Sequence, residues 1–430
     1  MRILLRWGLE MYGNNMKGNV FMLKPLVLAA AAAVASVQVM GGVRSGSMLL
    51  HQDPTTRNVT VSYALTADAV VTIDILTNGV PVEARALASM AGDVNRKVGA
   101  GEHKAFWRPD RSLPGFSFDA NVTARVTAWP VDNPPDFMVV DLLYPSNITY
   151  YASAEAMPYD LTNTVYKTDK LVMRKIPAKN VRWRMGAGEI AANNSADWRA
   201  RETIHYVTFN DDYYMAIFPT TKAQYVRFGK GAVEDVNDAA TYHVAQHKTY
   251  YTTLRGKVSD GIDWPITGNS VKPGCTIDAV RKFTGIDTMD FPTESQWEYA
   301  CRAGTPTDFN NGKNLAGTWD PAPDGINVTG DGPQIVGTKP CNNWNLYDCH
   351  GNVAEWCLDW YLITPYAENS EQTDPPGPRS DDSRSPTLRC LRGGYWVGNT
   401  ISRSAYRDGG NPEGYVERAG FRLKCAAVAK

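Results

Sequence analysis

Apolar and polar residues alternate along the segment Val59–Pro130. Alternation with a period of two, rich in β-branched residues, is typical of strands that bury one face. The strands that the pattern predicts have the sequences VTVSYALT, AVVTIDILT, HKAFW and NVTARVTAW. Asn78-Gly79 and the GAGE stretch at residues 99–102 carry the residue types of tight turns. Several short strands at this spacing predict an all-β sandwich.

Three segments of this region, SYALTADAVVTIDILTNGVPV, VGAGEHKAFW and NVTARVTAW, resemble the immunoglobulin-like domain of flagellar-hook-capping proteins and of many secreted bacterial chains. The resemblance implies a spacer or an adhesion module, and we see no catalytic grouping here. We place this immunoglobulin-like sandwich at residues 55–150. The proline cluster in VDNPPDF marks a domain boundary, and we expect a connecting stretch from there to about Thr168.

The N-terminus carries the features of a secretory signal. Lys24 precedes the apolar run Pro25–Met40, and Gly41 and Gly42 follow it. A cationic flank, a short apolar core and a small-residue exit define a signal peptide, whereas a membrane span needs about 20 strongly apolar residues. We therefore place a leader at residues 1–42, with the signal around residues 22–42, and favour export over a retained anchor. A secreted, periplasmic or cell-envelope protein is expected, without a transmembrane helix in the mature chain.

The segment FPTESQWEYACRAG carries the signals of a capped helix. Thr293 and Gln296 form the pattern of a capping box, and Gly304 suits the helix end. Glu294 and Glu298 are interpreted as a partner for the helix dipole and as an ion-pairing or polar core group. A catalytic role for either carboxylate is the weaker alternative.

LYDCHGNVAEW is a candidate cation site. Asp348 and Glu355 bracket a tight turn at Gly351, whose flexible backbone can turn carbonyl groups inward. Carboxylates combined with main-chain oxygens are the ligands of Ca²⁺, which takes about 6–8 oxygen atoms. In the alternative interpretation, the two carboxylates only hold loop amides and arginine side chains.

RGGYW places two glycines before paired aromatic residues, so the backbone is expected to approach another group closely there. Arg403, Arg407 and Arg422 recur around this motif. We interpret them as bidentate partners of buried carboxylates such as Glu355 or Asp359. Recognition of an acidic or peptidic ligand is the alternative.

Five blocks of the C-terminal half together resemble one family. They are LVMRKIPAKNVRWRMGAGE, HYVTFNDDYYMAIFPTTKAQYVRF, DFPTESQWEYACRAGT, NNWNLYDCHGNVAEWCLDWY and RCLRGGYWVGNTISRSAYRDGGNPEGYVERAGFRLK. In this order and spacing they resemble the formylglycine-generating enzyme family, also called the sulfatase-modifying-factor domain. The resemblance implies an α+β fold related to C-type lectins, with low regular secondary structure, at residues 168–427. The 12 Trp, 36 Gly and 26 Pro of the chain fit such a loop-rich fold.

The family binds structural calcium at the segment that corresponds to LYDCHGNVAEW. Carried over by position, the resemblance gives a ligand set of two carboxylates and two carbonyls at Asp348, Glu355, Gly351 and Val353. A second calcium site of the family would begin near Asn314 and Leu315. Its remaining ligands are hard to place in PDGINVTGDGPQ, so this second site is the weaker expectation.

The family's enzymes use molecular oxygen to oxidise a cysteine of a sulfatase peptide to formylglycine, with two cysteines that bind Cu(I). Soft thiolates suit that ion. Here the motif is GGYWVGNTISRSAYR, with Tyr395 in place of the usual serine. The cysteine positions fall on Gly398 and Arg403 when aligned from the glycines, and the second falls on Asn399 when aligned from the downstream arginine. No cysteine occurs between Leu391 and Lys424, so the sequence argues against copper and assigns no catalytic residue.

Composition narrows the function further. The 44 Lys and Arg against 45 Asp and Glu exclude a dominant nucleic-acid footprint. No P-loop, G-x-S-x-G elbow or G-x-G-x-x-G fingerprint is present. His243 and His247 are four residues apart without an evident third ligand, so we expect surface histidines. The 7 cysteines begin at Cys275, and their pairing cannot be read from the sequence.

Two functions remain. The favoured one is a calcium-stabilised binding or structural module, exported from the cell, for a peptide, a glycan or a partner protein. Its candidate ligand groove consists of Trp396, Asn399, Arg403 and Arg407. The alternative is a divergent enzyme that modifies sulfatases or other exported proteins, so whether the chain is an enzyme stays open.

Overall fold

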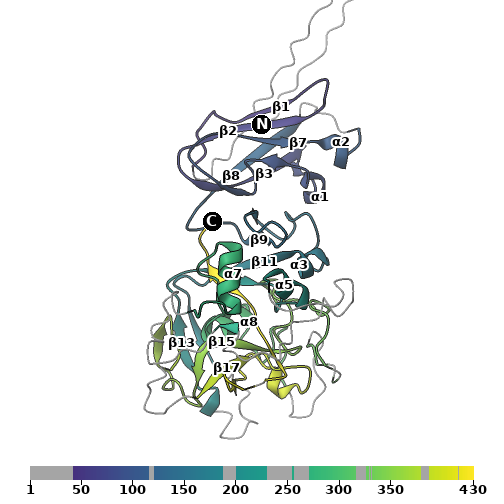
Figure 1. Cartoon of the computed structure of the whole chain (residues 1–430). Helices are drawn as coiled ribbons and strands as arrows, with labels where there is room; N and C mark the ends of the chain where they lie inside the picture. The colour runs from purple at the N-terminus through teal and green to yellow at the C-terminus, as the bar shows by residue number, and fades with distance from the viewer. Residues whose placement is uncertain are drawn as a thin grey trace, which may run out of the picture.

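A computed structural model describes residues 42–115, 121–186, 200–229, 254–255, 271–315, 326–328, 330, 332–378, 387–414 and 416–430. An N-terminal β domain lies above a larger C-terminal domain of strands and short helices (Figure 1). The predicted leader, apart from Gly42, and the histidines at 243 and 247 lie outside the described residues. Within the described ranges, no helix has the length and apolarity needed to cross a membrane.

The N-terminal domain is built from two antiparallel sheets. The first has the strand order β1 (Leu49–Gln52), β2 (Val59–Leu65), β7 (Gly101–Trp107) and β5 (Ala91–Gly92). The second has the order β4 (Val80–Pro81), β3 (Ala69–Thr77) and β6 (Arg96–Val98), with β8 (Val122–Pro130) also paired to β3. Two single-turn helices, α1 (Ala84–Leu87) and α2 (Pro109–Ser112), lie in the connections.

The alternating pattern places one face of each sheet in a shared core. The four predicted strands are confirmed as β2, β3, β7 and β8. Their buried residues, such as Val61, Ile73 and Trp107, form one apolar cluster that draws on both sheets. Asn78 and Gly79 both have positive φ, at 52° and 78°, as a type I′ turn between β3 and β4 requires. Kinship with the immunoglobulin-like domain stays a prediction.

The predicted boundaries of the sandwich are wrong at both ends. Val43 already bridges to Leu65 and belongs to the sandwich core, so the domain begins before residue 55. At the other end, β9 (Phe137–Asp141) pairs with β11 (Lys170–Ile176), and β10 (Ile148–Tyr151) pairs with β9. The segment 137–151 therefore belongs to the C-terminal domain. The alternation on which the sandwich was predicted ends at Pro130, and such a pattern does not say which sheet a later strand joins.

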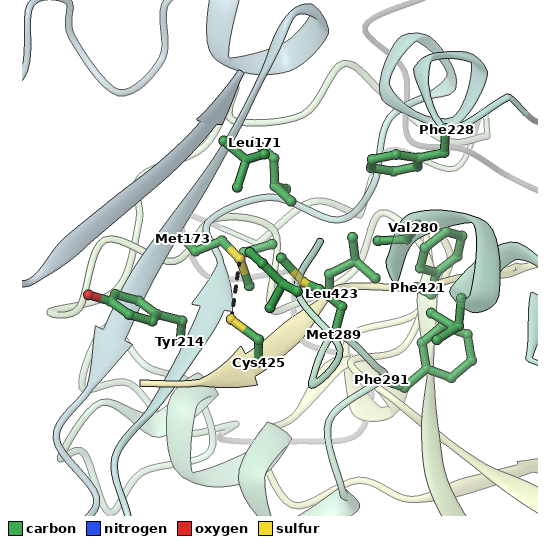
Figure 2. Packing of buried hydrophobic residues seen from close by; sticks show 14 of the residues in the cluster. Leu171, Met173, Tyr214, Phe228, Val280, Met289, Phe291, Phe421, Leu423 and Cys425 are labelled. Carbon is green, nitrogen blue, oxygen red and sulfur yellow. Dashed lines mark hydrogen bonds between the residues drawn. The ribbon is translucent and has the colours of Figure 1, made fainter. Parts of the chain in front are cut away.

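A five-stranded sheet forms the centre of the C-terminal domain. Its order is β10, β9, β11, β14 (Tyr213–Ala216) and β20 (Lys424–Ala426). One face packs on an apolar cluster that includes Leu171, Met173, Tyr214, Phe421 and Leu423, to which α7 (Thr276–Thr284) contributes Val280 (Figure 2). The first strand of the domain, β9, and its last strand, β20, therefore lie in the same sheet.

Two smaller sheets and short helices complete the domain. One sheet has the order β12 (Arg182–Met185), β13 (His205–Thr208) and β16 (Glu371–Thr373). The other has the order β18 (Asp408–Gly410), β17 (Leu388–Arg392), β15 (Ala354–Tyr361) and β19 (Ala419–Gly420). The further helices are α3 (Val165–Thr168), α5 (Lys222–Arg227), α8 (Glu294–Arg302) and the 3₁₀ turn Thr400–Ser402. The expectation of a mixed fold with little helix is confirmed.

The connection between the two domains is held against β11 by a buried lysine. Lys175 Nζ donates to Pro134 O at 2.6 Å and to Asn133 Oδ1 at 2.9 Å. Tyr214 donates its hydroxyl proton to Pro135 O. Beyond the connection, Tyr150 N donates to Asn95 O of the sandwich at 2.8 Å, and Val70 and Trp129 of the sandwich pack on the cluster of Figure 2. The two domains are therefore joined by a fixed, partly buried junction.

We expect Lys175→Met to loosen this junction. The substitution keeps the volume of the side chain but leaves the buried Pro134 carbonyl without its donor, which costs about 1–3 kcal/mol. Chemical denaturation and limited proteolysis between the domains would measure the effect. Lys179→Met is the control, because the Lys179 side chain is 59% exposed. Unchanged cleavage and stability in Lys175→Met would contradict the role of Lys175 in the junction.

Candidate functional site

Helix α8 organises the centre of the candidate site. Thr293 Oγ1 accepts from Gln296 N at 3.2 Å, and Gln296 Oε1 accepts from Thr293 N at 3.0 Å, so the predicted capping box is confirmed. The helix ends at Ala303, which has φ of 45° and precedes Gly304 with φ of 87°. This one helix therefore presents Glu294 and Glu298 on its buried side.

Both carboxylates of α8 are paired with arginines from the C-terminal segment. Arg407 binds Glu294 with two hydrogen bonds of 2.6 and 2.8 Å. Arg392 donates to Glu298 Oε2, and Arg302 Nε donates to Glu298 Oε1 at 2.8 Å. All five side chains are almost completely buried. The interpretation of these carboxylates as ion-pairing groups of the core, not catalytic groups, is thereby supported.

The charges of this network determine the pKa values of its carboxyl groups. Burial disfavours the charged form of Glu294, but the nearby Arg407 and Arg392 outweigh it and lower the pKa to about 2. Glu298 behaves in the same way, with Arg302 and Arg392 lowering its pKa against the effect of burial. Asp359, which accepts from Glu294 N at 2.6 Å, has a raised pKa because of burial and then of the Glu294 charge.

The four predicted groove residues do not form one exposed surface. Arg403 is only 2% exposed and binds Glu202 through two hydrogen bonds of 2.6 and 2.7 Å. Arg407 is equally buried against Glu294, so neither arginine is available to a ligand. The predicted ligand groove is therefore wrong in its two arginines. Buried carboxylates on distant segments satisfy the two arginines, and the sequence did not reveal those partners.

Trp396 and Asn399 are half-buried in a loop that the two glycines make possible, and Trp396 packs in part on an apolar core cluster. Gly393 and Gly394 have φ of 88° and 67°, and a Cβ atom on Gly394 would lie 2.4 Å from Ile401 O. The expected close approach is therefore confirmed. Beyond the glycines, Arg418 lies over the ring of Tyr395 at 4.3 Å and donates to its hydroxyl group. The result is a partly exposed aromatic surface, Tyr395 and Trp396 followed by the exposed Val397.

The predicted calcium turn folds around Gly351. A Cβ atom at this position would lie 2.3 Å from Asn327 O, so the turn requires glycine. Asp348 Oδ2 accepts from Gly337 N at 2.7 Å, and its Oδ1 accepts from Asn327 Nδ2 at 3.1 Å. Burial, and then the nearby Glu355 charge, raise the pKa of Asp348 against these hydrogen bonds. The two predicted carboxylates are thus close enough to influence each other.

Glu355 is engaged by an arginine and a tryptophan. Arg422 donates to both carboxylate oxygens, at 2.8 and 2.9 Å, and Trp297 Nε1 donates to Oε2 at 2.7 Å. In this arrangement Asp348 and Glu355 hold loop amides and Arg422, as the alternative interpretation expected. The carbonyl oxygens of Gly351 and Val353, in contrast, accept no hydrogen bond from the part of the chain that the structure describes.

The weaker calcium site has no further support in its first residues. Asn314 Oδ1 accepts from Asp308 N at 2.8 Å, and Leu315 N donates to Asp308 Oδ2 at 3.1 Å. Residues 316–325, which follow them, lie outside the described residues. Across the described ranges, no three His, Cys, Asp or Glu side chains are grouped to hold a metal ion. A cation at either site would therefore depend on backbone or amide oxygens.

All seven cysteines are free thiols, and none lies in the loop after the two glycines. Cys390 belongs to the core under α8, with its Sγ 3.3 Å from Glu294 Oε2, whereas Cys425 belongs to the cluster of Figure 2. Burial raises the pKa of both thiols, that of Cys425 to about 12.

His350, inside the predicted calcium turn, is a buried packing residue. Its Nδ1 donates to Ser402 O at 2.7 Å and its Nε2 accepts from Asn310 N at 3.1 Å.

Sequence reasoning missed the partners that hold this site together. Glu202 lies some two hundred positions before Arg403, and no local pattern distinguishes it from a surface glutamate. Arg392 carried a weak signal, since it lies inside the RCLRGGYW block beside the two glycines. Asn327 was not singled out, although its buried Oδ1 has no hydrogen-bond partner.

Comparison with known proteins gives matches over the C-terminal domain. Residues 175–427 match the sulfatase-modifying factor enzyme 1-like domain. The formylglycine-generating enzyme of Streptomyces coelicolor is 32% identical over 228 residues, covering 46% of this chain and 68% of that protein. The serine/threonine-protein kinase pkn1 of Chlamydia caviae is 27% identical over 258 residues, covering 56% of this chain. The chain spans only 37% of the length of this chlamydial relative.

Two solved structures each align with about 60% of the chain. Treponema denticola variable protein 1 aligns with a TM-score of 0.42 and 21% identity, covering 60% of this chain and 95% of that one. PvdO from Pseudomonas aeruginosa aligns with a TM-score of 0.41 and 20% identity, covering 60% of this chain and 94% of that one.

We expect Glu294→Gln to destabilise the C-terminal domain strongly. The substitution removes the charge that Arg407 binds and leaves this buried guanidinium without a carboxylate partner. Breaking one side of a buried ion pair costs about 3–5 kcal/mol. Chemical denaturation at pH 7, followed by tryptophan fluorescence, would measure the loss.

The control for this substitution is Glu371→Gln, which breaks a pair with Arg182 in which both side chains are more than half exposed. It should leave the unfolding midpoint unchanged. Because the pKa of Glu294 falls from 4.5 to about 2 on folding, its contribution is complete above pH 4.5 and is lost as the pH falls towards 2. The difference between wild type and Glu294→Gln should shrink over that interval. A difference that stays constant would contradict the pairing.

Proposed function

The chain belongs to the family of the sulfatase-modifying factor enzyme 1-like domain through residues 175–427, and from this premise we propose that it is an exported binding or structural protein. The observation that carries the proposal is the residue content of the loop after the two glycines. No cysteine occurs between Leu391 and Lys424, whereas a Cu(I) centre of the family's kind needs two thiolates. Gly398 and Arg403, or Asn399 in the other alignment, occupy the two cysteine positions and offer no soft ligand, and Tyr395 replaces the usual serine.

The thiols that flank this loop support the same conclusion. Cys390 and Cys425 are buried in two different apolar clusters, so they do not form a surface pair. Their raised pKa values disfavour the thiolate form, which is the form that binds metals and attacks substrates. We therefore propose neither copper binding nor formylglycine formation for this chain.

The proposed ligand surface is the aromatic loop of Tyr395, Trp396, Val397 and Asn399. Tyrosine and tryptophan are enriched at interfaces because each combines a large apolar ring with a polar group. Arg418 holds the Tyr395 ring in place, so this part of the surface is ordered before a ligand binds. Such a surface suits a peptide, a glycan or a partner protein. The buried Arg403 supports the end of the loop, because its Nε donates to Thr400 O at 3.0 Å.

Export and the N-terminal domain complete this proposal. The run Pro25–Met40 with its cationic and small-residue flanks supports secretion to the periplasm, the cell envelope or the medium. The two-sheet domain would then act as a spacer or adhesion module, which is the role that its resemblance to immunoglobulin-like domains suggests. The fixed junction at Lys175 favours a rigid spacer over a flexible tether.

A divergent enzyme acting on sulfatases or other exported proteins is the second candidate. The similarity to the formylglycine-generating enzyme of Streptomyces coelicolor favours it. This alternative requires a chemistry without the cysteine pair, and the described residues near the loop offer buried, paired side chains instead. The kinase activity in the name of the chlamydial relatives is a property of those proteins.

A turnover assay separates the two candidates. The purified full chain is incubated with copper, oxygen and a C-x-P-x-R peptide, and mass spectrometry follows conversion of thiol to aldehyde. We expect no conversion, together with saturable binding on a printed array of glycans or exported proteins that is lost in Trp396→Ala. Phe106→Ala, which removes a 48% exposed aromatic side chain of the sandwich, is the matched control. Conversion of the peptide would refute the binding-protein proposal.

We also propose that the turn at Gly351 binds a structural Ca²⁺. Asp348 and Glu355 would supply carboxylate oxygens, and Gly351 and Val353 would supply carbonyls. Three features support the fit: the two carbonyls without donors, the buried Asn327 Oδ1 without a partner, and the proximity of two carboxylates. A divalent cation would neutralise the mutual repulsion of these groups. Among the described residues, Glu355 Oε1 accepts one hydrogen bond, from Arg422, which leaves a lone pair for the ion.

We expect calcium to raise the melting temperature of the wild-type chain and a chelator to lower it. Saturation at about a hundred times the Kd would stabilise the fold by about 2.7 kcal/mol. Asp348→Asn should abolish the response, while Asp287→Asn, at an exposed position, should retain it. Scanning calorimetry with and without chelator measures both. Equal melting temperatures in calcium and in chelator would contradict the calcium site. Asp348 and Glu355 would then bind only amide groups and Arg422.

A further inference from the structure

Two of the buried cysteines lie against each other in the core of the C-terminal domain. Cys301 is in the last turn of α8, and Cys349 precedes the turn at Gly351. Cys301 Sγ lies 3.9 Å from Cys349 O and 3.7 Å from His350 Nε2. The two thiol groups also interact directly, and this interaction, followed by burial, raises the pKa of the Cys349 thiol. Both side chains belong to the same apolar cluster.

Other cysteines of the domain have contacts of a different kind. Cys390 Sγ lies 3.3 Å from a carboxylate oxygen of α8, and Cys425 Sγ lies 4.0 Å from a methionine sulfur. Cys275 Sγ accepts from a backbone N–H at 3.4 Å and thereby caps α7. Cys301 and Cys349, in contrast, place one thiol beside another.

The polar groups around the two thiols do not depend on them for hydrogen bonds. His350 Nε2 also accepts from a backbone N–H at 3.1 Å, Ser404 Oγ also donates to a backbone carbonyl at 3.0 Å, and Tyr347 O also accepts from an arginine at 2.8 Å. The contacts of these three atoms with the thiols are longer, at 3.7 to 3.9 Å. Because a thiol is a weak donor, loss of the two S–H protons would cost little hydrogen-bond energy.

We propose that Cys301 and Cys349 form a disulfide bond when the chain folds in an oxidising environment. The oxidant is itself a disulfide, either of glutathione or of a thiol–disulfide oxidoreductase. One cysteine thiolate attacks a sulfur of this disulfide and displaces a thiolate. The second cysteine thiolate then attacks the protein sulfur of the mixed disulfide and displaces the other thiolate. The two cysteines lose two protons and two electrons, and the oxidant is reduced to two thiols.

The bond has to form before α8 packs against the turn. Cys301 is 1% exposed and Cys349 is 4% exposed in the folded domain, so an oxidant cannot reach either thiol there. The two cysteines are 48 positions apart in the sequence. A bond that closes so long a loop restricts the unfolded chain and thereby favours the folded one. It also ties α8 to the turn that carries the proposed calcium ligands.

The inference rests on the proposed export only because export supplies an oxidising environment. The test therefore uses the purified full chain in a defined redox buffer. A disulfide in the refolded chain, together with reduced thiols in the protein isolated from cells, would support the inference and contradict export.

The chain is unfolded, reduced and then refolded with either oxidised or reduced glutathione. Under denaturing conditions the remaining thiols are alkylated, and intact mass spectrometry counts them. We expect oxidised glutathione to remove two of the seven thiols and to raise the melting temperature relative to the reduced chain. Peptide mapping should find the peptides that contain residues 301 and 349 joined to each other.

Cys301→Ala and Cys349→Ala should each abolish the loss of both thiols. Cys275→Ser is the matched control and should show the wild-type change, because it removes a buried thiol from another cluster and keeps an N-cap residue at α7. The mapping uses the wild-type chain, so it does not depend on the folding of the variants. Seven alkylated thiols after refolding in oxidised glutathione, or a disulfide that joins other cysteines instead, would overturn the proposal.

Discussion

The buried charge network around α8 is the constraint on which the C-terminal domain depends. Glu294 and Glu298 are almost completely buried, so the stability of the fold depends on an arginine partner for each. Two of these partners come from the C-terminal part of the domain: Arg392 is the last residue of β17, and Arg407 directly precedes β18. A domain with few helices and small sheets thereby gains a rigid centre. The same network removes Arg407 from the set of residues that could touch a ligand.

One short segment contains both buried residues that stabilise the domain and partly exposed residues that could contact a ligand. Within residues 393–407, the first two glycines and the two arginines are buried, Tyr395 and Trp396 are half-buried, and Val397 is exposed. The buried residues can therefore keep their contacts when the exposed residues of the segment are different. When the motif is aligned from its glycines, the positions of the family's cysteines fall on Gly398 and on the buried Arg403 of the same segment.

Features that depend on neighbouring residues could be predicted from the sequence. The alternation in Ala69–Thr77, the turn at Asn78-Gly79 and the capping box at Thr293 are all local features. Thr221 and Gln224 form the same capping box at α5. The pair between Glu202 and Arg403 depends on how distant segments meet, which no local pattern encodes. The family resemblance located the turn at Gly351, and the recurring arginines led us to expect a pair such as that between Arg422 and Glu355. Asn327 emerged only from the packing.

The pairing of β9 with β11 has a practical meaning for how the chain can be divided. Residues 137–151 precede the family match at 175–427 and still form two strands of the central sheet. A fragment cut at residue 175 would begin inside β11, and the strand left at its edge would expose buried apolar side chains and unpaired backbone groups. Such an edge invites association with other chains. The smallest fragment that keeps the sheet whole therefore begins before Phe137, at the prolines of the junction.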